Sequence, residues 1–114
     1  HGGRQLDGAL SAIRVLPEIV DAVGGQTEIH MDSGIRSGQD VLKAMALGAD
    51  GTYIGRAFIY GLGAKGKQGV TDALNVIHKE LDTTMALCGQ RKLTEVGRDI
   101  LLLDDEFNRY RRNI

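Results

Sequence analysis

The amino-acid sequence predicts an α/β fold with parallel strands that is incomplete as given. Residues 27–56 contain, in order, a strand, a glycine loop, a helix, a glycine and a second strand, which is the order and length of a βαβ unit. The chain has 16 glycines and one proline, about twice the usual glycine share of ~7%, and the glycines cluster at joints between elements. A parallel pair of strands has apolar faces and open edges that further strands and helices must cover. We therefore expect a piece of a larger sheet.

The first elements are read from turn residues and local composition. Residues 1–7 are predicted to form a loop. Pro17 is placed as the first residue of a short helix that stops at Gly24–Gly25. The β-rich run at 27–32 predicts the first strand.

The middle helix has a clear start and end. Ser37 with Asp40 three residues later resembles a capping box, and Gly48 stands where a left-handed C-terminal cap is required. The apolar face of this helix is predicted to comprise Val41, Leu42, Met45 and Ala46. The run at 51–55 then predicts the second strand.

The rest of the chain is predicted to be mainly helical. The longest helix spans 70–89 and stops at Gly89. Its apolar residues at helical spacing are Val70, Ala73, Leu74, Ile77, Leu81 and Met85. Residues 93–103 predict one more short turn or helix, and the charged tail at 104–114 is expected to be frayed or docked on a neighbour.

Charge and composition exclude several classes of protein. The formal net charge is −1, with 14 Lys and Arg against 15 Asp and Glu, so the sequence gives no support for a nucleic-acid partner, which would need a basic face. The single cysteine, Cys88, rules out an internal disulfide and fits a reducing compartment. No apolar run approaches the ~20 residues that cross a bilayer. The chain is long enough for one small core, and we expect one domain over residues 1–114.

Loops that contain glycine and arginine follow both predicted strands. In α/β sheets, ligands bind at the carboxyl ends of the strands, and in eight-stranded barrels the loops after the last two strands frequently bind phosphate. Gly34 and Gly38 let backbone N–H groups approach an anion, and the helix after Ser37 is expected to point its positive end at it. Arg36 and Arg56 carry planar, permanently charged groups suited to phosphate.

The alternative is that these glycines only turn the chain and that both arginines are solvated. Two such loops at equivalent strand ends, one helix apart, favour a phosphate site. Asp32, at the end of the first strand, could hold a sugar hydroxyl or orient an arginine.

The opening residues HGGRQLD combine a base and a carboxylate clamp. His1 can take up a proton near neutral pH, Arg4 can bind a carboxylate through two hydrogen bonds, and Gly2 and Gly3 leave room for a ligand. On the residues alone, a histidine in a loop near an arginine is usually only a surface residue.

Three motifs together carry a resemblance. HGGRQLD at 1–7, DSGIRSGQDVLKAMALGADGTYIGR at 32–56 and ELDTTMALCGQRKLTEV at 80–96 resemble, in order and spacing, the FMN-dependent α-hydroxy-acid oxidase and dehydrogenase family, and most of all its flavin-linked L-lactate dehydrogenases. The resemblance implies the C-terminal portion of a (βα)₈ TIM barrel, with strands seven and eight and their helices.

The resemblance also implies roles for individual residues. His1 is the catalytic base and Arg4 binds the substrate carboxylate. The positions that match the family's FMN-binding motif are Asp32, Ser33, Gly34, Arg36, Gly55 and Arg56. Ser33 departs from the glycine common in the family, and Gly3 from a frequent alanine. No metal site is implied.

The implied activity is the oxidation of a small L-2-hydroxy acid, L-lactate first, to the 2-oxo acid with FMN. Electrons pass to oxygen, a quinone or a cytochrome, in a homo-oligomer located in the cytoplasm or peripherally on the inner face of the membrane. The family's substrate tyrosines, the aspartate that pairs with the histidine and a flavin-side lysine are expected upstream. The segment alone is therefore expected to be inactive, and upstream chain or further copies are expected to cover its strand edges.

The residues also allow two other functions. Other FMN- or phosphate-binding barrels, such as the inosine-monophosphate dehydrogenase or isopentenyl-diphosphate isomerase groups, share the glycine–arginine loops but lack HGGRQLD. A non-catalytic module could keep the anion pocket without chemistry. Outside the site, His30 is predicted to be a structural histidine, His78 to be solvated and Cys88 to be buried. Met31, Met45 and Met85 are expected to fill gaps in the core.

Overall fold

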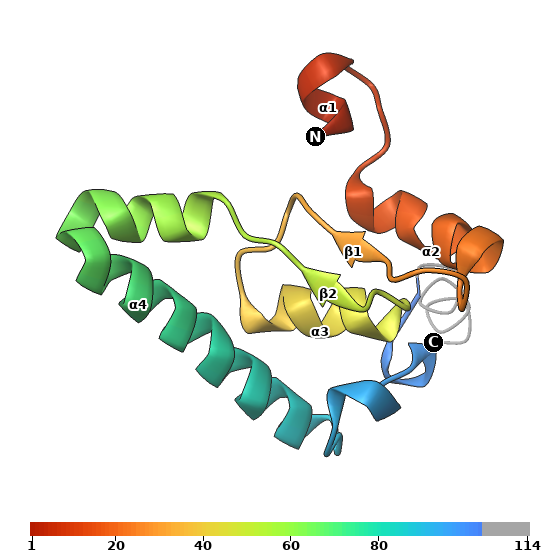
Figure 1. Cartoon of the computed structure of the whole chain (residues 1–114). Coiled ribbons are helices and arrows are strands. Elements are labelled where there is room, and N and C mark those ends of the chain that lie inside the picture. Colours follow the sequence, from red (N-terminus) through yellow and green to blue (C-terminus); the bar gives the residue numbers. More distant parts are fainter. Residues whose placement is uncertain (104–114) are drawn as a thin grey trace, which may run out of the picture.

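A computed structural model describes residues 1–103 of the chain. Its centre is a parallel pair of strands, β1 (His30–Met31) and β2 (Gly51–Thr52), in which His30 lies opposite Gly51 and Met31 opposite Thr52. The predicted parallel pair is confirmed (Figure 1). The paired strands are shorter than the predicted runs at 27–32 and 51–55. At their flanks the Ile29 N–H donates to Asp50 Oδ2 at 2.8 Å, and the carbonyls of Ile29 and Met31 accept from the N–H groups of Asp50 and Tyr53.

One apolar core joins the sheet to two helices. Helix α2 (Ala12–Val23) contributes Leu16, and helix α3 (Gly38–Ala46) contributes Ala44. These side chains pack with the buried strand and loop residues Ile29, Met31, Ile35 and Ala49. Met31 is buried while its neighbours His30 and Asp32 are exposed, so the sheet turns one face to the helices and the other to solvent.

Helix α2 begins earlier than predicted. Its N-cap is Ser11, and Pro17 lies inside the helix rather than at its first position. The burial of Leu16 against the sheet explains the longer helix, since tertiary packing outweighs the unfavourable proline. Residues 1–7 also differ from the predicted loop. Residues Gly2–Gln5 form the short helix α1, closed by a hydrogen bond from the Leu6 N–H to the Gly2 carbonyl.

Helix α3 follows the sequence prediction closely. Ser37 Oγ accepts from the Asp40 N–H, and the Asp40 carboxylate accepts from the Ser37 N–H, which completes the capping box. Gly48 has a φ of +106° directly after the helix, as the predicted left-handed cap requires. On the predicted apolar face, Leu42 and Ala46 are buried and Val41 and Met45 are half-buried.

Helix α4 (Arg56–Leu87) extends well beyond the predicted 70–89 span. Its helical dihedral angles are interrupted at Lys65 and Gly66, so the chain doubles back and forms a helical hairpin (Figure 1). The Gln68 amide and then the Lys65 ammonium hydrogen-bond to the Asp72 carboxylate and lower its pKa below 3.8, which ties the two sides of the bend. The contacts of Lys65 and Gln68 with the ionised Asp72 are present above the lowered pKa of Asp72 and are lost as the carboxyl is protonated at lower pH.

Two short 3₁₀ helices close the described chain. They are η1 (Leu93–Glu95) and η2 (Arg98–Ile100), in agreement with the predicted short turn or helix. The Arg98 guanidinium pairs with Asp21 of α2 at 3.3 Å, so this segment runs back to the first long helix. The expectation for residues 104–114 lies outside the described residues.

Candidate functional site

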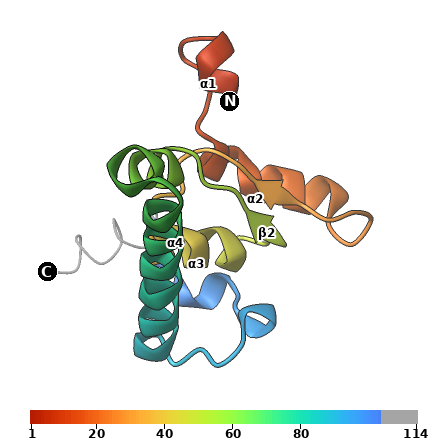
Figure 2. The same ribbon diagram turned by 60° about the vertical axis from the view of Figure 1, so that its left-hand side comes forward.

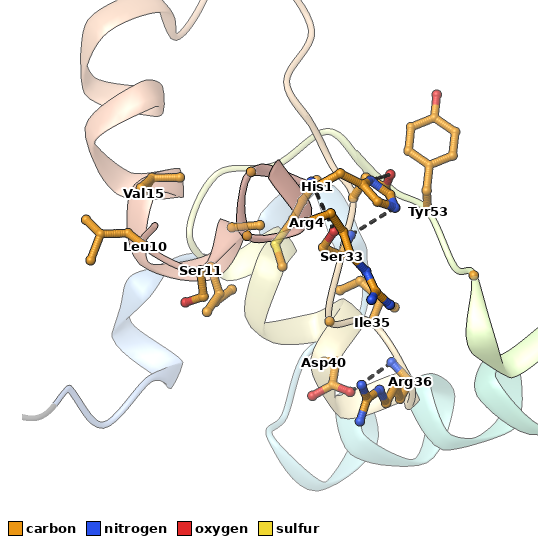
Figure 3. Close-up of a pocket in the computed structure, with 18 of the residues that line it drawn as sticks. His1, Arg4, Leu10, Ser11, Val15, Ser33, Ile35, Arg36, Asp40 and Tyr53 are labelled. Atoms are coloured by element: carbon orange, nitrogen blue, oxygen red, sulfur yellow. Dashed lines mark hydrogen bonds and ion pairs between the residues drawn. The ribbon is translucent and has the colours of Figure 1, made fainter. Parts of the chain in front are cut away.

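The predicted site residues lie around one cavity of about 940 Å³. It is located where β1 and β2 end, beside α1 (Figure 3). Every residue singled out for the site lines this cavity: His1, Arg4, Asp32, Ser33, Gly34, Arg36, Gly55 and Arg56. The chain therefore brings the opening heptapeptide and both strand-end loops together, although they are separated by up to 55 positions in the sequence (56 − 1).

A carboxylate holds the imidazole of His1. Its Nδ1 lies 3.0 Å from Asp32 Oδ2. Figure 3 shows His1 directed from α1 toward the loop after β1. Within residues 1–103, Asp32 is the carboxylate beside the imidazole, and the upstream aspartate that the resemblance implies stays a prediction. With Nδ1 facing the carboxylate, Nε2 has no partner among residues 1–103 and can accept a proton.

Positively charged side chains line the cavity together with the carboxylates of Asp32 and Asp40. The guanidinium groups of Arg4, Arg36 and Arg56 are exposed and form no ion pair within residues 1–103. Arg36 is nevertheless anchored through its backbone, because its N–H donates to Asp40 Oδ2 at 3.0 Å. Gly34 has a φ of +87°, in the left-handed region that favours glycine. A fixed backbone with free guanidinium groups suits an anionic ligand.

The expectation that the Gly38 N–H is available to an anion is wrong, because a carboxylate already accepts it. Asp40 Oδ2 accepts from the N–H groups of Arg36 and Ser37, and Glu80 Oε2 accepts from the Gly38 N–H at 2.8 Å. The Asp40 N–H is bonded to Ser37 Oγ. Two carboxylates thus occupy the N–H groups of Ser37 and Gly38, which leaves the predicted arginines as the charged groups available to an anion in the cavity.

Ser33 is the single non-glycine residue with positive φ among residues 1–103, at +89°. This geometry gives a physical reason for a glycine at the position, because a Cβ is strained in the left-handed region.

The substitution Ser33→Gly in the full-length protein is expected to raise the free energy of unfolding by about 0.5–1 kcal/mol, the relief of strain less the added freedom of the unfolded chain. Urea denaturation measures this change. Ser33→Ala is the control: it removes the hydroxyl but keeps the Cβ, so it should give no gain. Equal effects of the two variants would show that backbone strain at this position is negligible.

Several lining residues were not predicted from the sequence. Tyr53, Lys43 and Asp40 also line the cavity. Tyr53 follows β2 directly and shares its face with Gly55, so the alternation of the strand is the signal that could have found it. The Tyr53 hydroxyl lies 3.1 Å from His30 Nδ1, and Glu28 lies 3.3 Å from His30 Nε2.

The structure also tests the burial predicted for the histidine, cysteine and methionine residues outside the site. His30 has partners at both ring nitrogens, which agrees with a structural histidine, although it is exposed. His78 is exposed on α4, as predicted. The prediction that Cys88 is buried is wrong, since it is exposed at the end of α4. Met31 is buried, whereas Met45 and Met85 are half-buried.

Comparisons with known proteins agree with the geometry. The chain is 53% identical over 102 residues to an L-lactate dehydrogenase of Actinobacillus pleuropneumoniae serotype 5b, covering 90% of this chain and 27% of the relative. It is 50% identical over 106 residues to an L-lactate dehydrogenase of Xanthobacter autotrophicus, covering 93% and 27%.

Among solved structures, it superposes on (S)-mandelate dehydrogenase, described as a monotopic membrane protein, with a TM-score of 0.83 and 42% identity, covering 90% of this chain and 27% of that one. The fold is that of one part of a TIM barrel, and the chain spans about a quarter of the length of these relatives. The FMN-dependent dehydrogenase family matches residues 1–103. The chain therefore belongs to the FMN-dependent dehydrogenase family.

Proposed function

We propose that residues 1–114 are the C-terminal part, with strands seven and eight, of a barrel enzyme that uses FMN to oxidise a small L-2-hydroxy acid to the 2-oxo acid. L-Lactate is the proposed substrate. The observation that carries the proposal is that one cavity gathers His1, Arg4 and both strand-end loops. The identity to L-lactate dehydrogenases over these same residues supports it.

The cavity residues fit FMN. The phosphate would be held by the Arg36 and Arg56 guanidinium groups, which have no ion-pair partner within residues 1–103, together with the backbone at Gly34 and Gly55. Asp32 and Ser33 would face the ribityl chain. FMN, when bound, supplies the two-electron acceptor for the alcohol carbon.

The chain's own residues position the substrate and accept its proton. Arg4 would bind the substrate carboxylate through its planar fork and so fix the carbon that carries the hydroxyl. His1 Nε2 would accept a proton, either from that carbon or from the hydroxyl, while Asp32 at 3.0 Å from Nδ1 stabilises the imidazolium that forms. Both routes require the same orientation of the imidazole.

We also propose an electron acceptor among oxygen, a quinone and a cytochrome, and a homo-oligomeric enzyme in the cytoplasm or peripheral to the inner face of the membrane. The description of one structural relative as a monotopic membrane protein supports the membrane position. Within residues 1–103, none of the helices combines the length and apolarity that would carry it through a bilayer.

Anaerobic flavin reduction tests the function directly. Adding L-lactate to the FMN-loaded full-length protein is expected to bleach the flavin absorbance, and D-lactate is expected to leave it unchanged, because the proton acceptor and the clamp are on fixed sides of the substrate. The isolated 114-residue chain is expected to show no turnover with L-lactate, FMN and a dye. Failure of L-lactate and other small L-2-hydroxy acids to bleach the full-length protein would refute the proposal.

The phosphate contacts can be tested separately from turnover. Arg36→Met in the full-length protein is expected to raise the Kd for FMN by about 10–100-fold, because a hydrogen bond to a charged group is worth about 1.5–3 kcal/mol. The Kd for riboflavin, which lacks the phosphate, should not change. Arg14→Met is the matched control, since Arg14 is exposed and does not line the cavity. Equal affinities of Arg36→Met and wild type for FMN would exclude Arg36 from the phosphate site.

A further inference from the structure

We propose that Glu80 is a positioning residue for the FMN phosphate, acting through the Arg36 loop without touching the ligand. The inference rests on the proposed function. Glu80 belongs to α4 and is not among the residues that line the cavity. Its carboxylate nevertheless accepts the N–H of Gly38, 42 positions away in sequence, at 2.8 Å. This is the hydrogen bond that joins the start of α3 to α4.

Close packing around this bond holds the start of α3 against α4. A Cβ built on Gly38 would meet the backbone of Glu80 and Leu81 well inside van der Waals contact, so α3 starts directly on the backbone of α4. Figure 2 shows α3 alongside the second half of α4. The bond is partly buried, and its loss would leave the Gly38 N–H without its acceptor.

Hydrogen bonds fix the backbone of Arg36 relative to Gly38, which lies two residues later in the chain. The Arg36 and Ser37 N–H groups both donate to Asp40 Oδ2, at 3.0 and 3.1 Å, and Asp40 is in the first turn of α3. The backbone of Arg36 is therefore fixed relative to α3, and Glu80 fixes the start of α3 relative to α4. A shift of this start moves the guanidinium of Arg36 in the cavity.

Helix α4 also carries the second arginine of the proposed phosphate site, because it begins at Arg56. Its two halves are held together where Gly61 and Gly69 meet backbone to backbone. One hairpin thus bears Arg56 at its start and Glu80 near its end. Glu80 thereby sets the separation of the two guanidinium groups that would hold the phosphate.

The test compares ligands with and without a phosphate. Glu80→Met in the full-length protein is expected to raise the Kd for FMN about tenfold and to leave the Kd for riboflavin within about twofold. Glu80→Gln keeps a carbonyl oxygen for the Gly38 N–H and should restore the FMN affinity to within about threefold of wild type. Asp82→Met, an exposed carboxylate on the same helix, is the control and should change neither Kd.

The outcomes separate the two proposals. If wild type binds neither flavin, the proposed function fails. If wild type and Glu80→Met bind FMN equally tightly, the positioning role is overturned while the function stands. The same holds if Glu80→Met binds FMN and riboflavin more weakly by the same factor. An equal loss in Glu80→Gln and Glu80→Met also overturns it. If Glu80→Met does not fold, Glu80→Asp replaces it, and its shorter side chain should selectively weaken FMN.

Discussion

Replacing His1 by glutamine in the full-length protein is expected to lower kcat for L-2-hydroxy-acid oxidation by about 10²–10⁴-fold, the usual contribution of a positioned base. Glutamine keeps a polar group near Asp32 but cannot accept a proton from the substrate. The Kd for FMN should stay within about twofold, because the phosphate contacts come from the strand-end loops. Single-turnover flavin reduction measures the chemical step, and a flavin titration measures binding.

The chain offers a matched control for this substitution. His30 is also exposed and also lies beside a carboxylate, with Glu28 at 3.3 Å, but it does not line the cavity. His30→Gln is expected to leave kcat within about threefold of wild type. A His1→Gln enzyme with full activity would remove the base from the mechanism, and an equal loss in both variants would show that the effect is not specific to the site.

Gly69→Ala is expected to destabilise the full-length protein by about 3 kcal/mol or more, which places it among the severe single substitutions. The added Cβ would occupy the space of the Gly61 carbonyl, so the two halves of α4 must separate. Backbone cannot move aside as a side chain does. Because Arg56 and Glu80 lie on these two halves, FMN affinity should fall together with stability. Chemical denaturation gives the first quantity and flavin titration the second.

A glycine-to-alanine substitution elsewhere in α4 should stabilise the protein instead of destabilising it. Gly63 lies in the first half of the helix, and a Cβ there would meet no atom within 4 Å. Gly63→Ala is therefore expected to stabilise the protein by up to about 1 kcal/mol through helix propensity alone. Equal destabilisation by the two variants would show that helix geometry, and not the Gly61–Gly69 contact, sets the cost.

Local signals predicted the centre of the fold well. The capping box of Ser37 and Asp40, the cap at Gly48 and the parallel pairing of the strands are each encoded within a few residues, and the structure confirms them. The first half of α4 was not predicted, because its glycines are poor helix formers and weaken the helical pattern. Of these glycines, Gly61 is needed where it meets Gly69 of the second half, a requirement that is visible only in three dimensions.

The site likewise has features that the sequence predicted and long-range contacts that it did not. The residue types and the strand ends pointed to Arg36 and Arg56, and the cavity brings both together with His1. The pairing of His1 with Asp32 and the bond from Gly38 to Glu80 could not be read from spacing, because each joins residues more than 30 positions apart. The contact from Gly38 to Glu80 removes one predicted N–H donor, whereas Arg36 and Arg56, predicted from the sequence, both line the cavity.

The most direct test of this account is a crystal structure of the full-length protein with FMN. We expect phosphate oxygens about 3 Å from the guanidinium groups of both Arg36 and Arg56, with the His1 imidazole in the same cavity as the flavin ring. A flavin whose phosphate lies elsewhere, with both guanidinium groups directed to solvent, would contradict it.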